Sequence, residues 1–168
     1  MKFKPGSIVH YHPERGEDYT LCECIVRDSH QTTSNLPKEE HRWIYWLEGF
    51  HSIVAEEALS LSRSTPLDDL VLHVEIGDGS KWEIPAGLIG LNRARCYADE
   101  HGGDLLRSYL NDTVPLFGEC HYEIADWVSN NMNWDEVFHY AKQIEKPSAP
   151  DYDHGLANGN KYVVRVSQ

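Results

Sequence analysis

Four side chains of metal-ligating type stand in two alternating pairs near the start of the chain. One residue separates His10 from His12, and one residue separates Cys22 from Cys24. In an extended strand, residues two apart project from the same face. If the two segments pair as a hairpin with His10 opposite Cys24, then His12 lies opposite Cys22. This register would gather two imidazoles and two thiolates on one face, a ligand set that zinc accepts.

The alternative interpretation assigns these side chains no metal. Structural zinc sites are usually built on Cys-x2-Cys pairs, and the spacing of Cys22 and Cys24 does not match that pattern. Reduced cysteines facing the core and partly exposed histidines then account for the same four residues. We therefore expect no cofactor, with zinc bound by the four residues as the alternative.

A second candidate chemistry lies on one predicted helix, which carries Asn92, Arg93 and Arg95 in a strongly acidic region. A guanidinium in such a position can bind a carboxylate or a phosphate. The competing interpretation is an ion pair within the helix, because Arg95 stands four residues before Asp99. Exposed pairs of this kind contribute about 0.2–0.5 kcal/mol. We favour the ion pair, since such pairs are common on helix surfaces.

Carboxylates and carboxamides also concentrate around the junction of two predicted helices. Carboxylates gathered at one end can hold a divalent cation, but the spacing does not match an EF-hand loop. Helix capping explains part of the set. Asn133 can accept from first-turn amides, and Glu136 can reach back to the cap. The residues concerned are Asp126, Asn130, Asn131, Asn133, Asp135 and Glu136.

The sequence contains no signature of nucleophilic or phosphate-transfer chemistry. There is no Gly-x-Ser-x-Gly elbow and no recognisable cysteine-protease motif. The glycines at 77, 79, 102 and 103 do not match a phosphate-binding loop, because none is followed by Lys and then Ser or Thr. The ten histidines are scattered, without a carboxylate partner visible in the sequence. An enzyme stays open, but a non-enzymatic function is favoured.

The net charge of −12 is unevenly distributed, because residues 99–153 hold twelve acidic and three basic residues. Such a surface repels phosphate backbones, which argues against direct binding to nucleic acid or to anionic membranes. It suits a basic protein partner, or it serves solubility alone. The acids expected at helix ends or in loops are the candidate partner-binding residues: Asp99, Glu100, Asp104, Asp112, Glu119, Asp135 and Glu136.

Length and composition indicate a globular protein. The chain has 168 residues, of which 40% are hydrophobic and 25% charged, so it can build a sizeable core. No apolar run approaches the roughly 20 residues of a membrane helix. The start, MKFKPGS, has basic residues but no apolar stretch after them, so it does not resemble a secretory signal. We expect the protein in the cytoplasm.

The first sixty residues favour strands. Short β-branched or aromatic segments at residues 7–11, 21–28, 42–47 and 52–55 are separated by turn-rich stretches. Residues 42–47 (RWIYWL) are apolar on both alternations, so both faces of this strand should be covered. The stretch 61–66 (LSRSTP) is the best boundary. It predicts a first portion over residues 1–62 and a second over 67–168.

The second portion predicts an α+β arrangement. Residues 70–76 and 81–84 form a hairpin, and the period then changes to that of helices. One helix is expected over 86–100, ended by Gly102-Gly103, and a short one capped by Asp104. Further helices are expected over 122–131 and from Asn133 through Glu145, followed by a polar loop and a strand at 161–166.

Two resemblances add to this interpretation. The strand lengths and turns of residues 1–62 resemble a small SH3-like β-barrel, a fold that commonly binds peptides. Over residues 70–160 the chain resembles small uncharacterised proteins encoded by bacteriophages and prophages. The segments that carry this second resemblance are residues 82–98, residues 125–137 with their NNMNWDEV run, and Asn158-Gly159. It implies a phage or prophage origin and a host-cytoplasmic setting, and it implies no reaction.

The function favoured by these observations is non-enzymatic. We expect an interaction protein that binds a host or phage protein, for example an acidic inhibitor that occupies the DNA-binding groove of a host nucleic-acid-handling or defence protein. A small metal-dependent hydrolase or zinc-stabilised module using the His and Cys pairs is the alternative from another class. A virion or assembly component is a third hypothesis that the sequence does not separate from the first.

Overall fold

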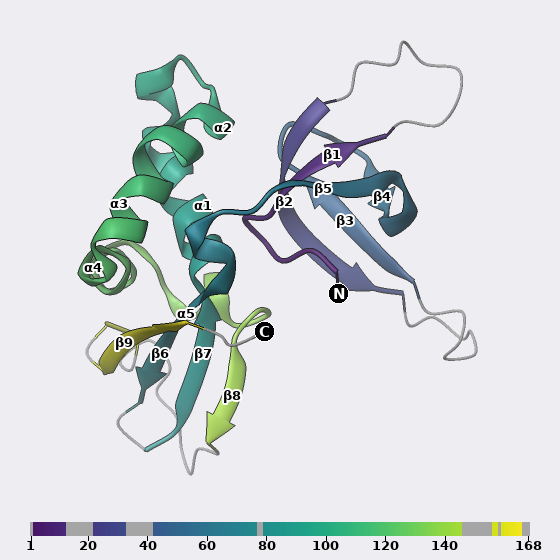
Figure 1. Cartoon of the computed structure of the whole chain (residues 1–168). Coiled ribbons are helices and arrows are strands. Elements are labelled where there is room, and N and C mark those ends of the chain that lie inside the picture. Colours follow the sequence, from purple (N-terminus) through teal and green to yellow (C-terminus); the bar gives the residue numbers. More distant parts are fainter. Residues whose placement is uncertain are drawn as a thin grey trace. The chain divides into compact units, whose positions relative to one another are not determined.

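The computed structural model describes residues 2–12, 22–32, 42–76, 79–145, 156–157 and 159–165. It divides into two compact units, Met1–Thr65 (unit 1) and Pro66–Gln168 (unit 2) (Figure 1). Two antiparallel sheets and several helices make the fold α+β, as the sequence predicts. In the described part of the chain, every helix is too short or too polar to cross a membrane.

Unit 1 is a five-stranded antiparallel sheet with the strand order β4-β3-β2-β1-β5. A single 3-10 turn, η2 (Glu56–Ala58), joins the last two strands. The strands are β1 (Ile8–Tyr11), β2 (Cys22–Gln31), β3 (Trp43–Leu47), β4 (Ile53–Ala55) and β5 (Leu59–Arg63).

Strand β2 is the longest in the unit because it serves two partners. Its first half pairs with β1, and its second half pairs with β3 beyond a bulge between Val26 and Asp28. The sequence predicts an end at Asp28, but pairing with β3 extends the strand to Gln31. A bulge bends a strand and increases its twist, which lets one strand belong to two differently oriented ladders.

The core of unit 1 forms between these strands, and Tyr45 is its largest fully buried side chain. The Tyr45 hydroxyl accepts from the backbone N–H of Lys2 at 3.1 Å and donates to Glu56 Oε2 at 2.5 Å. Burial, followed by the contact with Glu56, raises the pKa of Tyr45 to about 12. The buried cluster comprises Phe3, Val9, Cys24, Val26, Tyr45, Leu47, Val54 and Leu59.

Strand β5 enters the stretch 61–66 that the sequence predicts as the boundary between the two portions. Leu59–Arg63 form a strand that pairs with β1, a strand that the sequence analysis does not identify. Leu59 is buried, whereas Leu61 is 52% exposed, so the strand has no regular apolar face that would reveal it. The division between the units therefore follows this strand, after Thr65.

Unit 2 begins with a 3-10 turn, η3 (Pro66–Asp69), and contains a four-stranded antiparallel sheet with the order β8-β7-β6-β9. Alternating residues of β7 are buried, and in β6 the first three residues and Val74 are buried, so the two central strands contribute to the core. The strands are β6 (Leu70–Glu75), β7 (Lys81–Pro85), β8 (Lys142–Glu145) and β9 (Asn160–Arg165).

Helical segments fill the chain between β7 and β8. Helix α1 is followed by the 3-10 turn η4, and the glycines after it adopt left-handed backbone angles, with φ of +66° at Gly102 and +85° at Gly103. The expected glycine stop is thus confirmed. The segments are α1 (Ala86–Tyr97), η4 (Ala98–His101), α2 (Leu105–Ser108), the π-helical turn η5 (Tyr109–Thr113), α3 (Val114–Glu119), α4 (His121–Asn131) and α5 (Trp134–Val137).

The last expected helix is too long. The capping box of Asn133 and Glu136 is present and begins α5, but the helix ends at Val137. Residues 142–145 form β8 instead, paired with the edge of β7. A capping signal marks where a helix begins and carries no information about its length, so pairing with the sheet overrides the helical tendency of Lys142-Gln-Ile-Glu.

Helix α1 packs so closely that one glycine has no room for a side chain. A Cβ on Gly90 would lie 2.9 Å from Leu67 Cδ1 and 3.1 Å from Tyr109 Cε2. Both neighbours are buried, at 1% and 0% exposure, so neither can move aside freely. We predict that Gly90→Ala destabilises unit 2 by about 1–3 kcal/mol through overpacking. The cost of overpacking outweighs the stabilisation of about 1 kcal/mol that alanine provides through its higher helix propensity.

The matched control is Gly118→Ala on α3, where the added Cβ meets Pro66 Cβ at an ordinary 3.5 Å. Its stability should equal or exceed that of the wild type. Urea unfolding followed by tryptophan fluorescence measures both variants. Equal stability of the two variants would contradict the close packing at Gly90.

Candidate functional site

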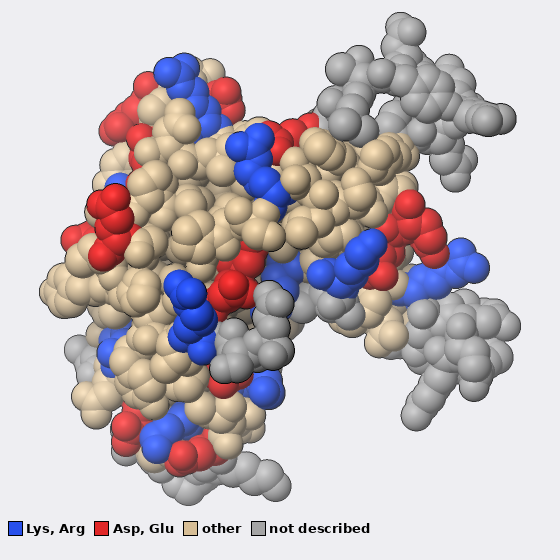
Figure 2. Space-filling model, in the orientation of Figure 1, with Lys and Arg blue, Asp and Glu red and all other residues tan. Residues whose placement is uncertain are grey.

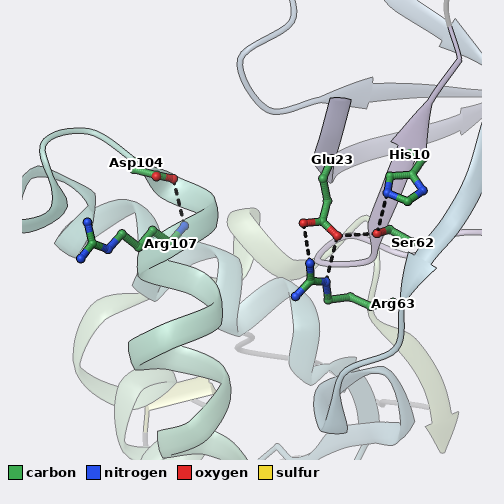
Figure 3. Close-up of polar contacts among 6 residues, drawn as sticks. All are labelled: His10, Glu23, Ser62, Arg63, Asp104 and Arg107. Atoms are coloured by element: carbon green, nitrogen blue, oxygen red, sulfur yellow. Dashed lines mark hydrogen bonds and ion pairs between the residues drawn. The ribbon is translucent and has the colours of Figure 1, made fainter. Parts of the chain in front are cut away.

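The face of unit 1 formed by β1, β2 and β5 carries a connected group of polar side chains. In the β1–β2 register His10 lies opposite Glu23, and on the other side it lies opposite Ser60 of β5. Opposing residues of antiparallel strands share a face, so these side chains meet. Figure 3 shows His10, Glu23, Ser62 and Arg63 converging there.

Glu23 is the centre of this group. Arg63 binds it through two parallel hydrogen bonds, Nε to Oε1 at 2.8 Å and Nη2 to Oε2 at 2.7 Å. The Ser62 hydroxyl donates to the same Oε1, and His10 Nε2 lies 3.1 Å from Ser62 Oγ. Beside it, His12 Nε2 lies 2.7 Å from Ser60 Oγ.

The direction of the protons decides what this group can do. Ser62 has one hydroxyl hydrogen, and it goes to Glu23, so His10 Nε2 must donate to Ser62 Oγ. A serine nucleophile needs the reverse arrangement, with its hydroxyl donating to the imidazole. The group therefore holds β1, β2 and β5 together and does not activate Ser62.

The charge of Glu23 is stabilised by its neighbours. Desolvation raises the pKa of Glu23, but the hydrogen bonds from Ser62 and Arg63, with the charges of Arg63 and His10, outweigh it and hold the pKa below its ordinary value. Only 21% of the Glu23 side chain is exposed, compared with 52% for Arg63.

The hairpin register expected for a zinc site is wrong by one residue. Val9, and not His10, lies opposite Cys24, and Tyr11 lies opposite Cys22. Cys24 is buried in the core at 6% exposure, whereas His10 and His12 reach Ser62 and Ser60 on the polar face. The side chain of Cys22 lies outside the described part. In this register the imidazoles and the Cys24 thiol do not converge, and the described residues contain no group of metal-ligating side chains.

Three of the seven acids expected to bind a partner have structural contacts. Asp104 caps α2 by accepting from the Arg107 backbone N–H at 3.0 Å, and Figure 3 shows the Arg107 guanidinium turned away from it. Asp112, on the π-helical turn, contacts His101 Nε2. Glu136 accepts from Asn133 N at 2.9 Å as part of the capping box.

The other four acids are exposed: Asp99, Glu100, Glu119 and Asp135. Their carboxylates form no hydrogen bond or ion pair with any residue that the structure describes. Figure 2 shows acidic side chains in several separate groups, with basic side chains between them. The four exposed acids lie on separate helical segments, Asp99 and Glu100 on η4, Glu119 on α3 and Asp135 on α5.

Asn92 and Arg93 serve the packing of the helices. Asn92 accepts from Trp127 Nε1 at 2.9 Å and donates to Glu136 Oε1 at 3.1 Å. The Arg93 guanidinium lies over the rings of Tyr97 and Trp127, at 4.6 and 5.7 Å from their centroids. Both residues thus bind within unit 2. Arg95, the third residue of the set, is exposed.

Two carboxamides of the helix junction also bond locally. Asn130 donates to the carbonyl of Asp126 at 3.0 Å and to its carboxylate at 3.1 Å. Asn131 donates to the carbonyl of Trp127 at 3.1 Å. Helix-terminal hydrogen bonding and capping, which the sequence favours over a cation site, account for these contacts.

Sequence reasoning missed Glu23, Ser62 and Arg63. They come from β2 and from a strand that was not expected, about 40 residues apart in the chain. No local spacing signals such a group. Comparison with known proteins adds no assignment, because no protein-family model, curated protein or solved structure matches the chain.

The lowered pKa of Glu23 predicts how the group responds to pH. Because the folded pKa lies below the unfolded one, the contribution of ionised Glu23 to stability is complete above the ordinary value near 4.5 and is lost as pH falls through the folded pKa. Glu23→Gln should therefore lower the free energy of unfolding by about 0.5–1 kcal/mol at pH 7, as for a partly exposed pair. The difference from the wild type should shrink below pH 4.

Urea unfolding at pH 7, 5 and 3.5 measures this difference. Glu57→Gln is the control, because Glu57 is 65% exposed and lies 3.9 Å from Arg42, too far for a hydrogen bond. It should change stability little at any of the three pH values. A loss in Glu23→Gln that stays constant from pH 7 to 3.5 would refute the role of ionised Glu23.

Proposed function

We propose that the protein is a non-enzymatic interaction protein that binds a basic surface of another protein through acidic helix ends of unit 2. The supporting observation is the exposure of Asp99, Glu100, Glu119 and Asp135, together with the lack of any contact between their carboxylates and the described residues. Asp104, Asp112 and Glu136, which were expected in the same surface, have structural contacts and are left out of it.

The positions of these acids suit protein binding. Asp99 and Glu100 lie on η4, Glu119 is the last residue of α3, and Asp135 lies in the first turn of α5. A carboxylate at the end of a folded helix loses less conformational entropy on binding than one on a loose loop. More of the Coulombic attraction to the partner therefore contributes to the binding free energy. Acidic patches also raise the rate of association with a basic target.

A basic groove that binds nucleic acid is the target that such patches fit best. Proteins that handle nucleic acid contact phosphates with Lys and Arg, and rigid carboxylates can occupy the same contacts. We therefore propose a host nucleic-acid-handling or defence protein as the partner. The predicted resemblance of residues 70–160 to phage and prophage proteins favours this choice, and we propose the host cytoplasm as the setting.

Unit 1 is proposed to be a small SH3-like barrel that acts as an accompanying interaction module. Three features support the assignment. Strand β2 belongs to two ladders, a 3-10 turn separates β4 from β5, and β5 returns to pair with β1. A fold of this kind hosts many functions, so its role in this chain depends on its surface.

The charge-reversal variant Asp99→Lys/Glu100→Lys tests the proposal. Tagged wild-type and variant proteins are used to capture partners from a bacterial host lysate at two salt concentrations. The wild type should retain a basic nucleic-acid-binding protein, and the variant should associate with it several-fold more slowly and with a weaker salt dependence. Glu119→Lys/Asp135→Lys tests the second patch in the same way.

The control is Glu57→Lys/Glu145→Lys, which changes the net charge equally at two exposed acids outside the patches. Both acids are ion-paired, Glu57 with Arg42 and Glu145 with Lys81, so circular dichroism is used to check that this variant folds. It should bind like the wild type. The purified partner should lose duplex DNA when the wild-type protein is added, whereas the protein alone should leave DNA unshifted. If neither patch variant differs from the control, the acids serve solubility and the proposed function is wrong.

A further inference from the structure

Unit 1 contains an open depression of about 400 Å³ lined by His12, Arg42, Ala55, Glu57 and Ala58. This volume lies in the range of small-molecule sites. The depression lies where β1 ends, where β3 begins and where η2 follows β4. The backbone N–H of His12 donates to the carbonyl of Ala58 at 2.9 Å, which fixes one wall. Two alanine side chains in the lining leave the space unfilled.

Its charged residues are placed by the β3–β4 ladder. Ile44 lies opposite Ala55 at the end of this ladder, Arg42 lies two residues before Ile44, and Glu57 follows Ala55 on the 3-10 turn η2. Arg42 Nη1 and Glu57 Oε1 are 3.9 Å apart, which is an ion pair without a hydrogen bond. Their side chains are 74% and 65% exposed.

Arg63 and Arg42 of unit 1 differ in whether their guanidinium N–H groups are already hydrogen-bonded. Arg63 uses both edges of its guanidinium on Glu23, at 2.8 and 2.7 Å. The Arg42 guanidinium lines the depression and makes no hydrogen bond to any residue that the structure describes. His12 bonds Ser60 through Nε2, and its Nδ1 has no partner among the described residues.

We propose that this depression binds a carboxylate group, held by the guanidinium of Arg42 and by the imidazole of His12. A guanidinium matches a carboxylate with two parallel hydrogen bonds, and this geometry favours a flat, two-oxygen anion. The small apolar walls at Ala55 and Ala58 accommodate a short aliphatic chain behind it. Glu57 is the built-in competitor, since its own carboxylate lies beside Arg42 without reaching hydrogen-bond distance.

The carboxylate can come from a free organic acid or from the end of a peptide chain. Acetate, trialanine and trialanine amide are therefore the probes, with sodium chloride at equal ionic strength as the reference. Binding is followed in the full-length protein by the NMR signals of the His12 ring. Acetate and trialanine should shift these signals saturably with millimolar dissociation constants, as suits one exposed charge-assisted contact, and the amide should not.

The variants make the assignment specific. Arg42→Gln should abolish the saturable shift, and Arg42→Lys should weaken binding about fivefold because it keeps the charge but loses the planar fork. Glu57→Gln should tighten binding about threefold, because it removes the competing carboxylate. Arg63→Gln is the matched control and should bind like the wild type, since Arg63 is engaged by Glu23.

Similar binding of acetate and trialanine would support a site for carboxylates in general. If trialanine binds at least tenfold more tightly than acetate, the site is specific for the C-terminal carboxylate of a peptide chain. Three results would overturn the proposal: a shift that persists in Arg42→Gln, equal binding of trialanine and its amide, or weaker binding in Glu57→Gln. Inorganic phosphate that binds tenfold tighter than acetate would also overturn it. These readouts involve unit 1 alone and do not depend on the acidic patches of unit 2.

Discussion

Val9 lies opposite Cys24 in the pairing of β1 with β2, and this register fixes which side chains of both strands reach the core. Because the side-chain period of a strand is two, a slip of one residue would exchange the faces. If β1 slipped against β2, His10 would enter the apolar cluster beside Cys24, and Val9 would move to the polar face. The cost of burying that imidazole unpaired holds the register. The polar group around Glu23, the apolar core and the absence of a mixed His and Cys face are three consequences of one alignment.

Unit 2 depends in a similar way on Asn92, a carboxamide that donates to one helix and accepts from another. It accepts from Trp127 of α4 and donates to Glu136 of α5, and Glu136 in turn caps its own helix. Truncation of Asn92 would leave the half-buried Trp127 Nε1 without its acceptor, at a cost of about 1–3 kcal/mol. This internal use of Glu136 separates it from Asp135, the adjacent residue, whose carboxylate is exposed. Helix capping thus decides which acids are available to a partner.

Local sequence signals predict most of the strands and helices of this fold. Long-range strand pairing determines the registers and boundaries that those signals do not predict. Short β-branched or aromatic runs between turn residues located β1, β3, β6 and β7, and the caps at Asp104 and Asn133 located the starts of two helices. The β1–β2 register was missed because the spacing of His10, His12, Cys22 and Cys24 is equally compatible with both alignments. The Glu23–Arg63 pair was missed because it joins strands 40 residues apart, and β8 because sheet pairing outweighs helix propensity in a four-residue segment.

Charged side chains that are hydrogen-bonded within the fold differ from those that remain available to a ligand. Arg63 and Arg42 are both exposed arginines beside a glutamate, yet only Arg63 reaches hydrogen-bond distance of its partner. A guanidinium that is already bound on two edges cannot bind a ligand without first losing those bonds. The Arg42 guanidinium lies 3.9 Å from the Glu57 carboxylate, so Glu57 offsets its charge without occupying its N–H donors. Arg42 resembles Asp99 and Asp135 in this respect, because the charged group of each makes no hydrogen bond within the described part of the chain. Such residues can bind a ligand or a partner without first breaking contacts of the protein's own structure.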